Sequence, residues 1–280
     1  MPLYRQKDAS GFTLPTAIQT SALDSDYVLM IDGSGNPYKI TKANLLAGLS
    51  SGNGGTSGGG GGSGSSTTDT YFADVVVLMP GSDLLNKSTH FTPNINAGSV
   101  TSSTTKSKWG GSSLRFPGST FIDITDTNDF NVGGQDATIE MWFNPDATLA
   151  SGNGQVLFEM RPDGGNGAFP MVSYDGSSLQ CYFNGSTILN VSESFTGDTW
   201  YYVALKKLGT TTSLWLNGSQ VGTFTSGDWG NSGRIALGAL AFRSLAPSTY
   251  FVGYVDDFRF TLGQARDVSV VPTAAFPLSA

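Results

Sequence analysis

The sequence predicts an all-β protein whose main body is two stacked antiparallel sheets. Aspartate outnumbers glutamate by 19 to 3, and glycine supplies 37 of the 280 residues, a bias that favours turns over helices. Short aromatic- and valine-rich runs, about a dozen in number, follow one another between turn signals after residue 70. No segment longer than about ten residues has the periodicity of a helix. Together these features are typical of a two-sheet sandwich.

The charge balance excludes several classes of partner. Charged residues make up 13% of the chain, against a usual share of about 25%, and the net charge is −7. This balance predicts no nucleic-acid binding, and no apolar run is long enough for membrane insertion. The polar N-terminus predicts no signal peptide, so we expect synthesis in a cytoplasm. Cys181 is predicted to be a small buried residue, because the single histidine, His90, lies in a polar stretch.

Residues 1–49 predict a small unit made of a hairpin and a short helix. Tyr27–Ile31 has the pattern of a short strand, and Tyr38–Ile40 returns as a second strand after a turn rich in Gly and Asn. Thr41 can cap the helical turns of residues 42–47. The unit has too little core to be independent, so we expect it to pack on copies of itself or on another surface.

Residues 50–70 are dominated by glycine, serine and threonine, with five consecutive glycines near their centre. This composition predicts a flexible linker with a root-mean-square span of roughly 25 Å. We interpret the linker as a spacer between a base and a head, the alternative being an insertion without a role.

Residues 71–280 form the predicted head, which is long enough to bury a core without disulfides. Three strong hairpin signals, Asp175-Gly176, Asn184-Gly185 and Asn217-Gly218, connect neighbouring strands. The predicted strands are Ala73–Met79, Ser113–Phe116, Phe121–Ile124, Ala137–Phe143, Gln155–Met160, Phe169–Tyr174, Leu179–Phe183, Ile188–Val191, Trp200–Lys207, Ser213–Leu216, Val221–Phe224, Arg234–Leu237 and Val252–Phe260.

The last of these strands carries large apolar side chains on both faces, so it belongs inside a sheet that is covered on both sides. Strict alternation places Asp256 on the same face as Phe258 and Phe260. A carboxylate among aromatic rings needs hydrogen bonds or a metal ion. We therefore predict that Asp256 accepts N–H hydrogen bonds, with calcium binding as the alternative.

Five blocks of the head, in the same order along the chain, resemble the laminin-G-like, concanavalin A-type jelly-roll family. The blocks are Val75–Leu78; Lys108–Phe116; Thr138–Phe143; Trp200–Leu205 with Leu214–Gly218; and Gly253–Phe260. The resemblance implies a jelly roll in which the first strand, Val75–Leu78, lies beside the last one, Val255–Phe260. It also implies that ligand sites lie on the concave face or in the rim loops.

The N-terminal unit resembles the segment that attaches many phage tail-fibre and appendage proteins to the virion, commonly as trimers. The resemblance rests on two strands around a glycine turn, followed by Ala43-Asn44-Leu45-Leu46. The tail over residues 264–277 is similar to the ending of such heads in phage structural proteins. The residues implied to contact other virion proteins are Tyr27, Leu29, Ile31, Tyr38, Ile40, Leu45 and Leu46.

Sugar binding would need an exposed aromatic ring beside Asn or Asp side chains. Trp229, next to Asp228 and close to Asn231, meets that description. Tyr174 with Asp175 forms a second candidate in the opposite set of loops. The alternative for Trp229 is that it covers the edge of the core.

Calcium is the one cofactor that the sequence suggests. Asp123, Asp126 and Asp129 follow one another in a polar rim segment, and Asp256 is a further candidate. Some laminin-G-like domains bind calcium through Asp side chains and rim carbonyls. The segment lacks an EF-hand pattern and Asp is common in loops, so a protein without any cofactor is the alternative.

The sequence predicts no catalysis. Glycoside hydrolases on this fold use paired carboxylates on one strand, whereas Glu140 and Glu159 occur singly between apolar residues. No Gly-x-Ser-x-Gly elbow and no phosphate-binding loop is present. We therefore expect that the protein is not an enzyme.

The resemblances imply a bacteriophage virion protein, a tail fibre or appendage made in the cytoplasm of the bacterial host. Its N-terminus would anchor a homo-oligomer, a trimer by resemblance, and its lectin-like head would bind a glycan or protein of the host surface. The alternative is a decoration protein of the capsid or tail with a purely structural role, because a fold alone does not fix a function.

Overall fold

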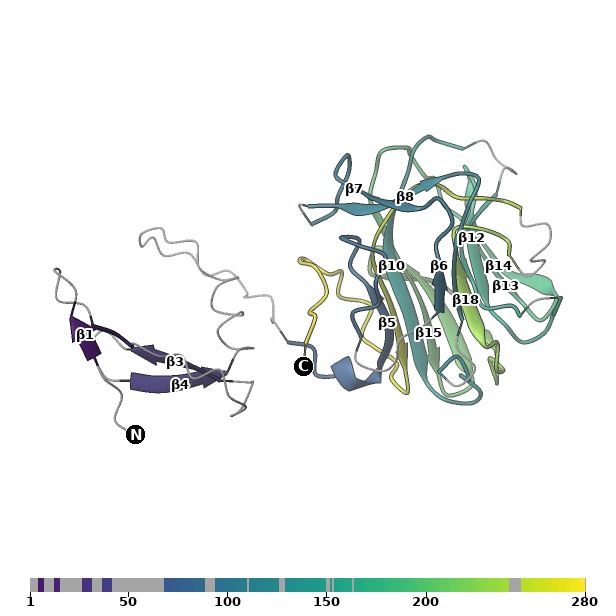
Figure 1. Cartoon of the computed structure of the whole chain (residues 1–280). Coiled ribbons are helices and arrows are strands. Elements are labelled where there is room, and N and C mark those ends of the chain that lie inside the picture. Colours follow the sequence, from purple (N-terminus) through teal and green to yellow (C-terminus); the bar gives the residue numbers. More distant parts are fainter. Residues whose placement is uncertain are drawn as a thin grey trace. The chain divides into compact units, whose positions relative to one another are not determined.

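The computed structural model describes the backbone of residues 5–7, 13–15, 27–31 and 37–41, and residues 68–279 except 89–93, 110, 126–128, 150–151, 153, 163 and 242–247. The chain divides into two units, residues 1–63 and 64–280 (Figure 1). None of the helices in the described part of the chain is long and apolar enough to cross a membrane.

The described residues of the N-terminal unit form two antiparallel strand pairs. Its strands are β1 (Arg5–Lys7), β2 (Thr13–Pro15), β3 (Tyr27–Ile31) and β4 (Pro37–Thr41), with β1 paired to β2 and β3 to β4. The second hairpin confirms the predicted strands that carry Tyr27, Leu29, Ile31, Tyr38 and Ile40. The predicted helix over residues 42–47, with Leu45 and Leu46, lies outside the described residues.

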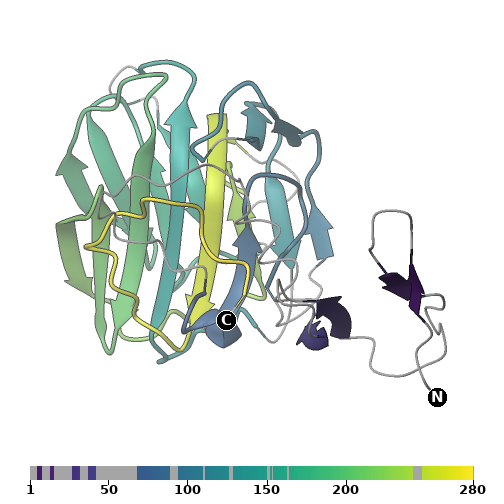
Figure 2. The ribbon, with the colours of Figure 1, turned by 90° about the vertical axis from the view of Figure 1, so that its left-hand side faces the viewer.

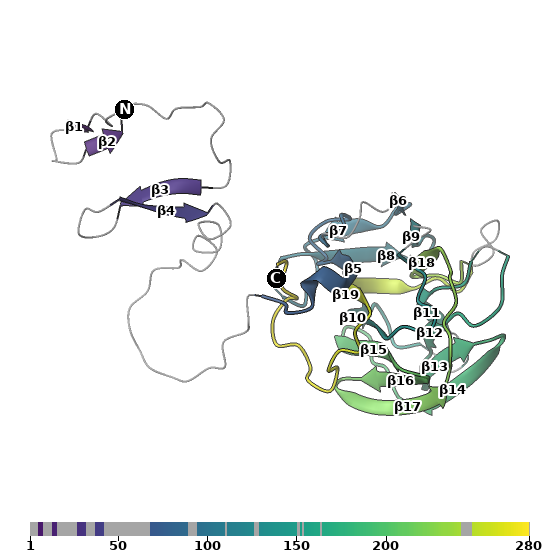
Figure 3. The ribbon, with the colours of Figure 1, turned by 90° about the horizontal axis from the view of Figure 1, so that it is seen from below.

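The head is a sandwich of two antiparallel sheets (Figures 1 and 3). The eight-stranded sheet has the order β17-β16-β15-β10-β19-β8-β7, with β5 also paired to β19, and the seven-stranded sheet has the order β14-β13-β12-β11-β18-β9-β6. After a 3-10 turn at Phe72–Asp74, the strands are β5 (Val75–Met79), β6 (Asn94–Asn96), β7 (Thr101–Ser103), β8 (Ser113–Pro117), β9 (Ile122–Thr125), β10 (Ala137–Pro145), β11 (Gln155–Glu159), β12 (Met171–Tyr174), β13 (Ser178–Phe183), β14 (Ser186–Ser192), β15 (Tyr201–Leu208), β16 (Thr211–Leu216), β17 (Ser219–Thr225), β18 (Arg234–Leu237) and β19 (Val252–Leu262).

Alternation along the strands builds the core between the sheets. In β10, Ile139, Met141 and Phe143 face this core, where they pack against side chains such as Phe158 and Leu179 of the other sheet. Fully burying each large apolar side chain contributes roughly 1.5–3 kcal/mol, so this layer is the main source of stability. The predicted all-β sandwich is confirmed.

The outer face of the eight-stranded sheet is covered by a second apolar layer. Trp142 and Tyr202 point outward from β10 and β15 and pack with Phe72, Val268 and Phe276. Figure 2 shows the C-terminal segment, in yellow, crossing this face of the sheet. The segments at both ends of the head therefore close one side of the sandwich.

The first and last strands of the head are neighbours, as the family resemblance implied. Val77 of β5 lies opposite Phe260 of β19, and Met79 lies opposite Phe258. The central position of β19, between β10 on one side and β5 and β8 on the other, accounts for its burial on both faces.

A β-bulge corrects the predicted faces of β19. Between the pairs Glu140–Arg259 and Trp142–Asp256 the register shifts by one residue, and Asp257 has φ +50°. A bulge turns the following side chains to the opposite face. Phe258 therefore enters the inner core, whereas Asp256 lies outside that core, so strict alternation across this strand was wrong.

Candidate functional site

The rim residues predicted for sugar binding do not form an exposed aromatic site. The side chain of Trp229 is fully buried, and its Nε1 donates a hydrogen bond to Thr212 Oγ1 at 2.9 Å. Asp228 accepts the N–H of Gly230, and Asn231 Oδ1 accepts the N–H of Gly233 at 3.2 Å. The prediction that Trp229 presents a ring face to a sugar was wrong, because this ring fills the core edge.

The second predicted ring is buried as well. Tyr174 is 1% exposed, packs on Phe143 and Phe195, and donates its hydroxyl to Gln155 Oε1 at 3.0 Å. Asp175 accepts the N–H groups of the hairpin turn, including that of Ser177 at 2.8 Å. Tyr174 therefore cannot stack on a ligand, and Asp175 shapes the turn that its sequence predicted.

The three predicted calcium ligands that the structure describes, Asp123, Asp129 and Asp256, do not form a cluster. Asp123 forms an ion pair with Arg234 at 2.8 Å, and Asp126 lies outside the described residues. Neither Asp129 nor Asp256 belongs to a cluster of three acidic, His or Cys side chains, since the described part of the head contains no such cluster. The carboxylate of Asp256 instead accepts the backbone N–H of Lys108 at 2.9 Å, which is the hydrogen-bonded arrangement predicted for it.

Glu140 and Glu159 lie on the outward faces of different sheets. Glu140 of β10 is hydrogen-bonded to Arg259 and Tyr202, and Glu159 of β11 is hydrogen-bonded to Arg161. Each glutamate is at most 1% exposed. Because the sandwich core separates them, these two carboxylates cannot flank a common glycosidic bond.

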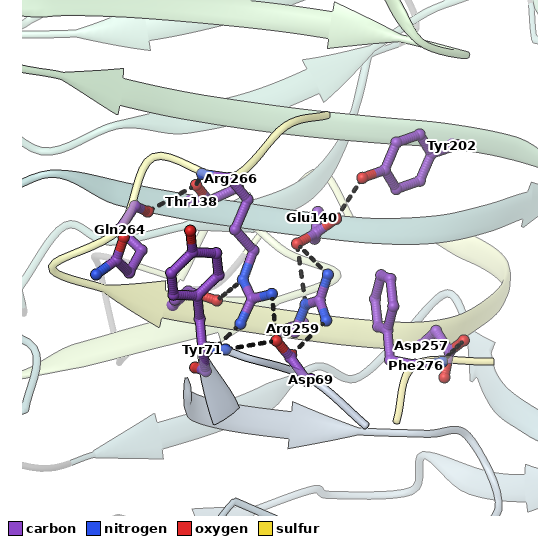
Figure 4. A network of polar contacts seen from close by, with 11 residues as sticks. Asp69, Tyr71, Thr138, Glu140, Tyr202, Asp257, Arg259, Gln264, Arg266 and Phe276 are labelled. Atoms are coloured by element: carbon purple, nitrogen blue, oxygen red, sulfur yellow. Dashed lines mark hydrogen bonds and ion pairs between the residues drawn. The ribbon is translucent and has the colours of Figure 1, made fainter. Parts of the chain in front are cut away.

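Figure 4 shows the polar network around Glu140 on the covered face of the eight-stranded sheet. The guanidinium of Arg259 lies between two carboxylates, at 2.8 Å from Glu140 Oε1 and 2.9 Å from Asp69 Oδ2. Arg266 donates to Asp69 Oδ1 at 2.9 Å and to the carbonyl of Tyr71 at 3.2 Å. Burial would raise the pKa of Asp69, but the hydrogen bond and charge of Arg266 hold it below its usual value. Two cations and two anions thus neutralise each other in a buried site.

The same network forms the floor of a cleft of about 400 Å³, lined by residues 68–71 and 272–277 together with Arg259 and Arg266. The N–H of Asp69 donates to the carbonyl of Ser279 at 2.9 Å, which joins the first lining segment to the chain just after the second. Because both guanidinium groups already bind carboxylates, we interpret this site as a structural clamp on the ends of the head.

Asp256 and Asp257, the adjacent carboxylates at the β19 bulge, should make the stability of the head depend on pH. Burial, with repulsion from Asp256, raises the pKa of Asp257 to about 7, and burial raises that of Asp256 to about 6. One oxygen of Asp257 accepts the N–H of Phe276 at 2.9 Å, and the other is buried, with the indole N–H of Trp109 as the nearby donor that favours the charged form. The folded state therefore holds protons that the unfolded state loses near pH 4.

Since the folded pKa values are raised, this pair stabilises the fold at low pH, and that contribution is lost as pH rises towards 7. We expect the free energy of unfolding to fall by on the order of 2–4 kcal/mol between pH 5 and pH 8 through these two groups. Urea titrations across this range measure the slope. Asp257→Asn should flatten it, and an equally steep slope in this variant would contradict the assignment.

A different surface is open on the seven-stranded sheet. Residues directly opposite each other in antiparallel strands share a face, and Leu179, Cys181 and Phe183 of β13 point into the core. Gln180 and Tyr182 therefore point outward. The residues of β12 and β14 that lie opposite Gln180 and Tyr182 in the strand pairing point outward as well. We call this surface the outer platform; its residues are Met171, Gln180, Tyr182, Thr187 and Asn190, and Ser173 lies in the same row but is buried.

The outer platform combines one aromatic ring with amide and hydroxyl groups. Tyr182 is partly exposed, Gln180 lies beside it along β13, and Asn190 and Thr187 are exposed on β14. The guanidinium of Arg161 lies 4.7 Å from the centre of the Tyr182 ring and forms an ion pair with Glu159 at 2.7 Å. Arg161 and Glu159 are both buried, so the ring of Tyr182 contacts a cation whose own position is restrained. An aromatic ring with neighbouring hydrogen-bonding groups is a typical surface for small-ligand recognition.

Comparison with known proteins places this geometry in a family. The model of the concanavalin A-like lectin/glucanases superfamily, of the laminin-G type, matches residues 116–264, more than half of the chain. No curated protein sequence matches the chain.

Solved structures share the fold at low sequence identity. The binding domain of Paraclostridial Mosquitocidal Protein 1 has a TM-score of 0.55 and 13% identity over 71% of this chain and 51% of that one. The binding domain of botulinum neurotoxin DC, in complex with rat synaptotagmin II, has a TM-score of 0.52 and 10% identity over 71% and 50%. The chain thus spans about half the length of these toxin domains.

A third structure is matched over almost its full length. Domain 4 of AbnA, an extracellular arabinanase from Geobacillus stearothermophilus, in complex with arabinotriose, has a TM-score of 0.51 and 16% identity over 70% of this chain and 97% of that one. With its two antiparallel sheets and its match to the family model, this chain belongs to the concanavalin A-like lectin/glucanases superfamily and carries a lectin-like jelly-roll head.

Proposed function

We propose that the head binds a host-surface glycan on the outer platform. The observation that carries the proposal is the partly exposed ring of Tyr182, held by Arg161 beneath it and flanked by exposed amide and hydroxyl groups. The arabinanase domain with this fold is in complex with arabinotriose, and the neurotoxin domain is in complex with rat synaptotagmin II. Both cases support recognition as the role of such a head.

The charges around the platform favour an uncharged sugar. The positive charge of Arg161 is neutralised by Glu159, and that of Arg234 by Asp123, so neither cation is left for an acidic glycan. We propose binding without catalysis, because Glu140 and Glu159 are buried on separate faces and each is held by an arginine.

Replacing Tyr182 by alanine should weaken glycan binding at least about tenfold, because the ring supplies the stacking surface. The measurement is a glycan array followed by titration of the strongest neutral oligosaccharide with the full chain. Tyr182→Phe keeps the ring and should retain most of the affinity. Leu208→Ala, which changes an exposed residue on another surface, is the control for an unrelated substitution.

Equal binding by wild type and Tyr182→Ala would remove the platform from the proposal. A folded wild type that binds neither sugars nor host cells would favour the alternative, a capsid or tail decoration protein with a structural role.

We propose further that the protein is a phage tail-fibre or appendage component, anchored by residues 1–49 and spaced by the linker over residues 50–70. Many heads of a homo-oligomer, each with modest affinity, would then bind a cell through avidity. The hairpin of β3 and β4 supports a small docking unit separate from the head.

Deleting residues 1–49 should remove the protein from particles while the head keeps its unfolding transition. Particles that retain the shortened protein would contradict the attachment role.

A further inference from the structure

A buried lysine amino group lies in a cage of backbone oxygens at the rim of the eight-stranded sheet. The side chain of Lys207, near the end of β15, has no exposed surface. Its Nζ donates three hydrogen bonds, to the carbonyls of Gly134 at 2.9 Å, Gln135 at 2.9 Å and Gly209 at 2.7 Å. These carbonyls come from two different segments, the turn before β10 and the hairpin turn between β15 and β16.

The hydrogen-bond pattern fixes the charge of this group. Only an ammonium has three N–H donors, whereas a neutral amine would turn a lone pair towards one of the carbonyls. Among the described residues Lys207 forms no ion pair with a carboxylate, so carbonyl dipoles alone contact the charge directly. Burial lowers the pKa of Lys207, and the charges of Asp136 and Asp228 oppose this by favouring the ammonium. Asp136 is itself fixed, because its Oδ1 accepts the N–H of Gly209 at 2.7 Å.

An all-oxygen set of backbone carbonyls with carboxylates close by is the chemistry that proteins use to hold hard cations such as calcium. In this head the position at the centre of the set is taken by a covalently attached cation. We propose that the rim cage of Gly134, Gln135 and Gly209 is a cation site whose resident cation is the Lys207 ammonium, and that truncating this side chain lets a calcium ion bind in its place.

The physical role follows from the two segments that the cage joins. Repulsion among three inward-pointing carbonyl oxygens would separate the turns, and a positive charge at their centre holds them together. The rim would then be organised without a bound metal ion, and the three predicted aspartates of residues 123–129 would not be needed for this purpose.

Thermal unfolding of the full chain tests the proposal, with calcium chloride at about 10 mM or with a chelator. The midpoint of the wild type should be the same in both. Lys207→Ala should unfold several degrees lower, and calcium should raise its midpoint by roughly 3–5 °C. Lys207→Met also loses the charge, but its side chain fills the space, so it should unfold lower and show no response to calcium. Lys206→Ala, at the neighbouring position, controls for loss of a lysine.

Three results would overturn the proposal. They are a Lys207→Met midpoint equal to that of the wild type, a Lys207→Ala midpoint that calcium leaves unchanged, and a calcium response of equal size in the wild type. If Lys207→Ala does not fold, nitrogen-15 NMR of the lysine side chains in the wild type decides instead. An ammonium resonance of Lys207 with protons protected from water exchange supports the caged cation, and its absence at neutral pH and low temperature overturns it.

Discussion

Replacing Arg259 by methionine is expected to lower the free energy of unfolding of the head by about 3–5 kcal/mol. The guanidinium lies between Asp69 and Glu140 and is 7% exposed. Methionine keeps the apolar stem but leaves Glu140 without its arginine partner, while Asp69 keeps only the ion pair with Arg266. Urea unfolding followed by tryptophan fluorescence measures the loss, since Trp142 lies in the layer beside this network.

A surface ion pair provides the matched control. Lys87 and Asp83 lie 2.7 Å apart, a distance similar to those at Arg259, but their side chains are 29% and 38% exposed. Lys87→Met should therefore cost less than about 1 kcal/mol. Adding Glu140→Gln to Arg259→Met should recover part of the loss, because the carboxylate that lost its arginine is then neutral, while Asp69 keeps its ion pair with Arg266. A loss for Arg259→Met no larger than that for Lys87→Met would refute the clamp.

Trp229→Ala should destabilise the head by about 3–5 kcal/mol, the usual cost of removing a large buried aromatic side chain. The ring is fully buried in the inner core, and its N–H is paired with Thr212. This variant also separates the two interpretations of this residue. As a core residue, Trp229 affects the unfolding midpoint; as a ligand ring, it would affect glycan affinity at temperatures where the fold is intact.

Trp229→Phe is the control for the second variant, because it retains an aromatic ring and loses the hydrogen bond to Thr212. Its loss should be clearly smaller than that of Trp229→Ala. A stable Trp229→Ala variant that has lost glycan binding would show that the ring acts as a ligand surface after all.

Local turn chemistry made much of this fold predictable. In Asn184-Gly185 and Asn217-Gly218 all four residues have positive φ, the backbone that a tight hairpin requires and that Asn and Gly adopt most readily. Both turns connect the strands that the sequence predicted. The sequence did not predict the edge strands β6 and β7, because they are short and polar. They are strands because they pair with β9 and β8, and their own sequences do not indicate a strand.

The site was less predictable because burial depends on distant segments. Trp229 lies in a run of Gly, Asp and Asn that is typical of an exposed loop, yet the rest of the head closes over it. The bulge at Asp256 and Asp257 arises from pairing with β10, which no pattern within β19 reveals. Tyr182 could have been found, since Leu179, Cys181 and Phe183 alternate with it and assign the outward face.

The hydrogen bond from Asp69 to Ser279 has a consequence for engineering the head. Because its two ends lie side by side, a circular permutant could join residue 279 to residue 69 through a few glycines and begin instead at the exposed Asn184-Gly185 turn. Every strand would keep its partners, but β14 and β13 would carry the new free ends. Such a permutant would show whether β13 and β14 pair because a tight turn connects them or because the neighbouring strands of the sheet hold them in place.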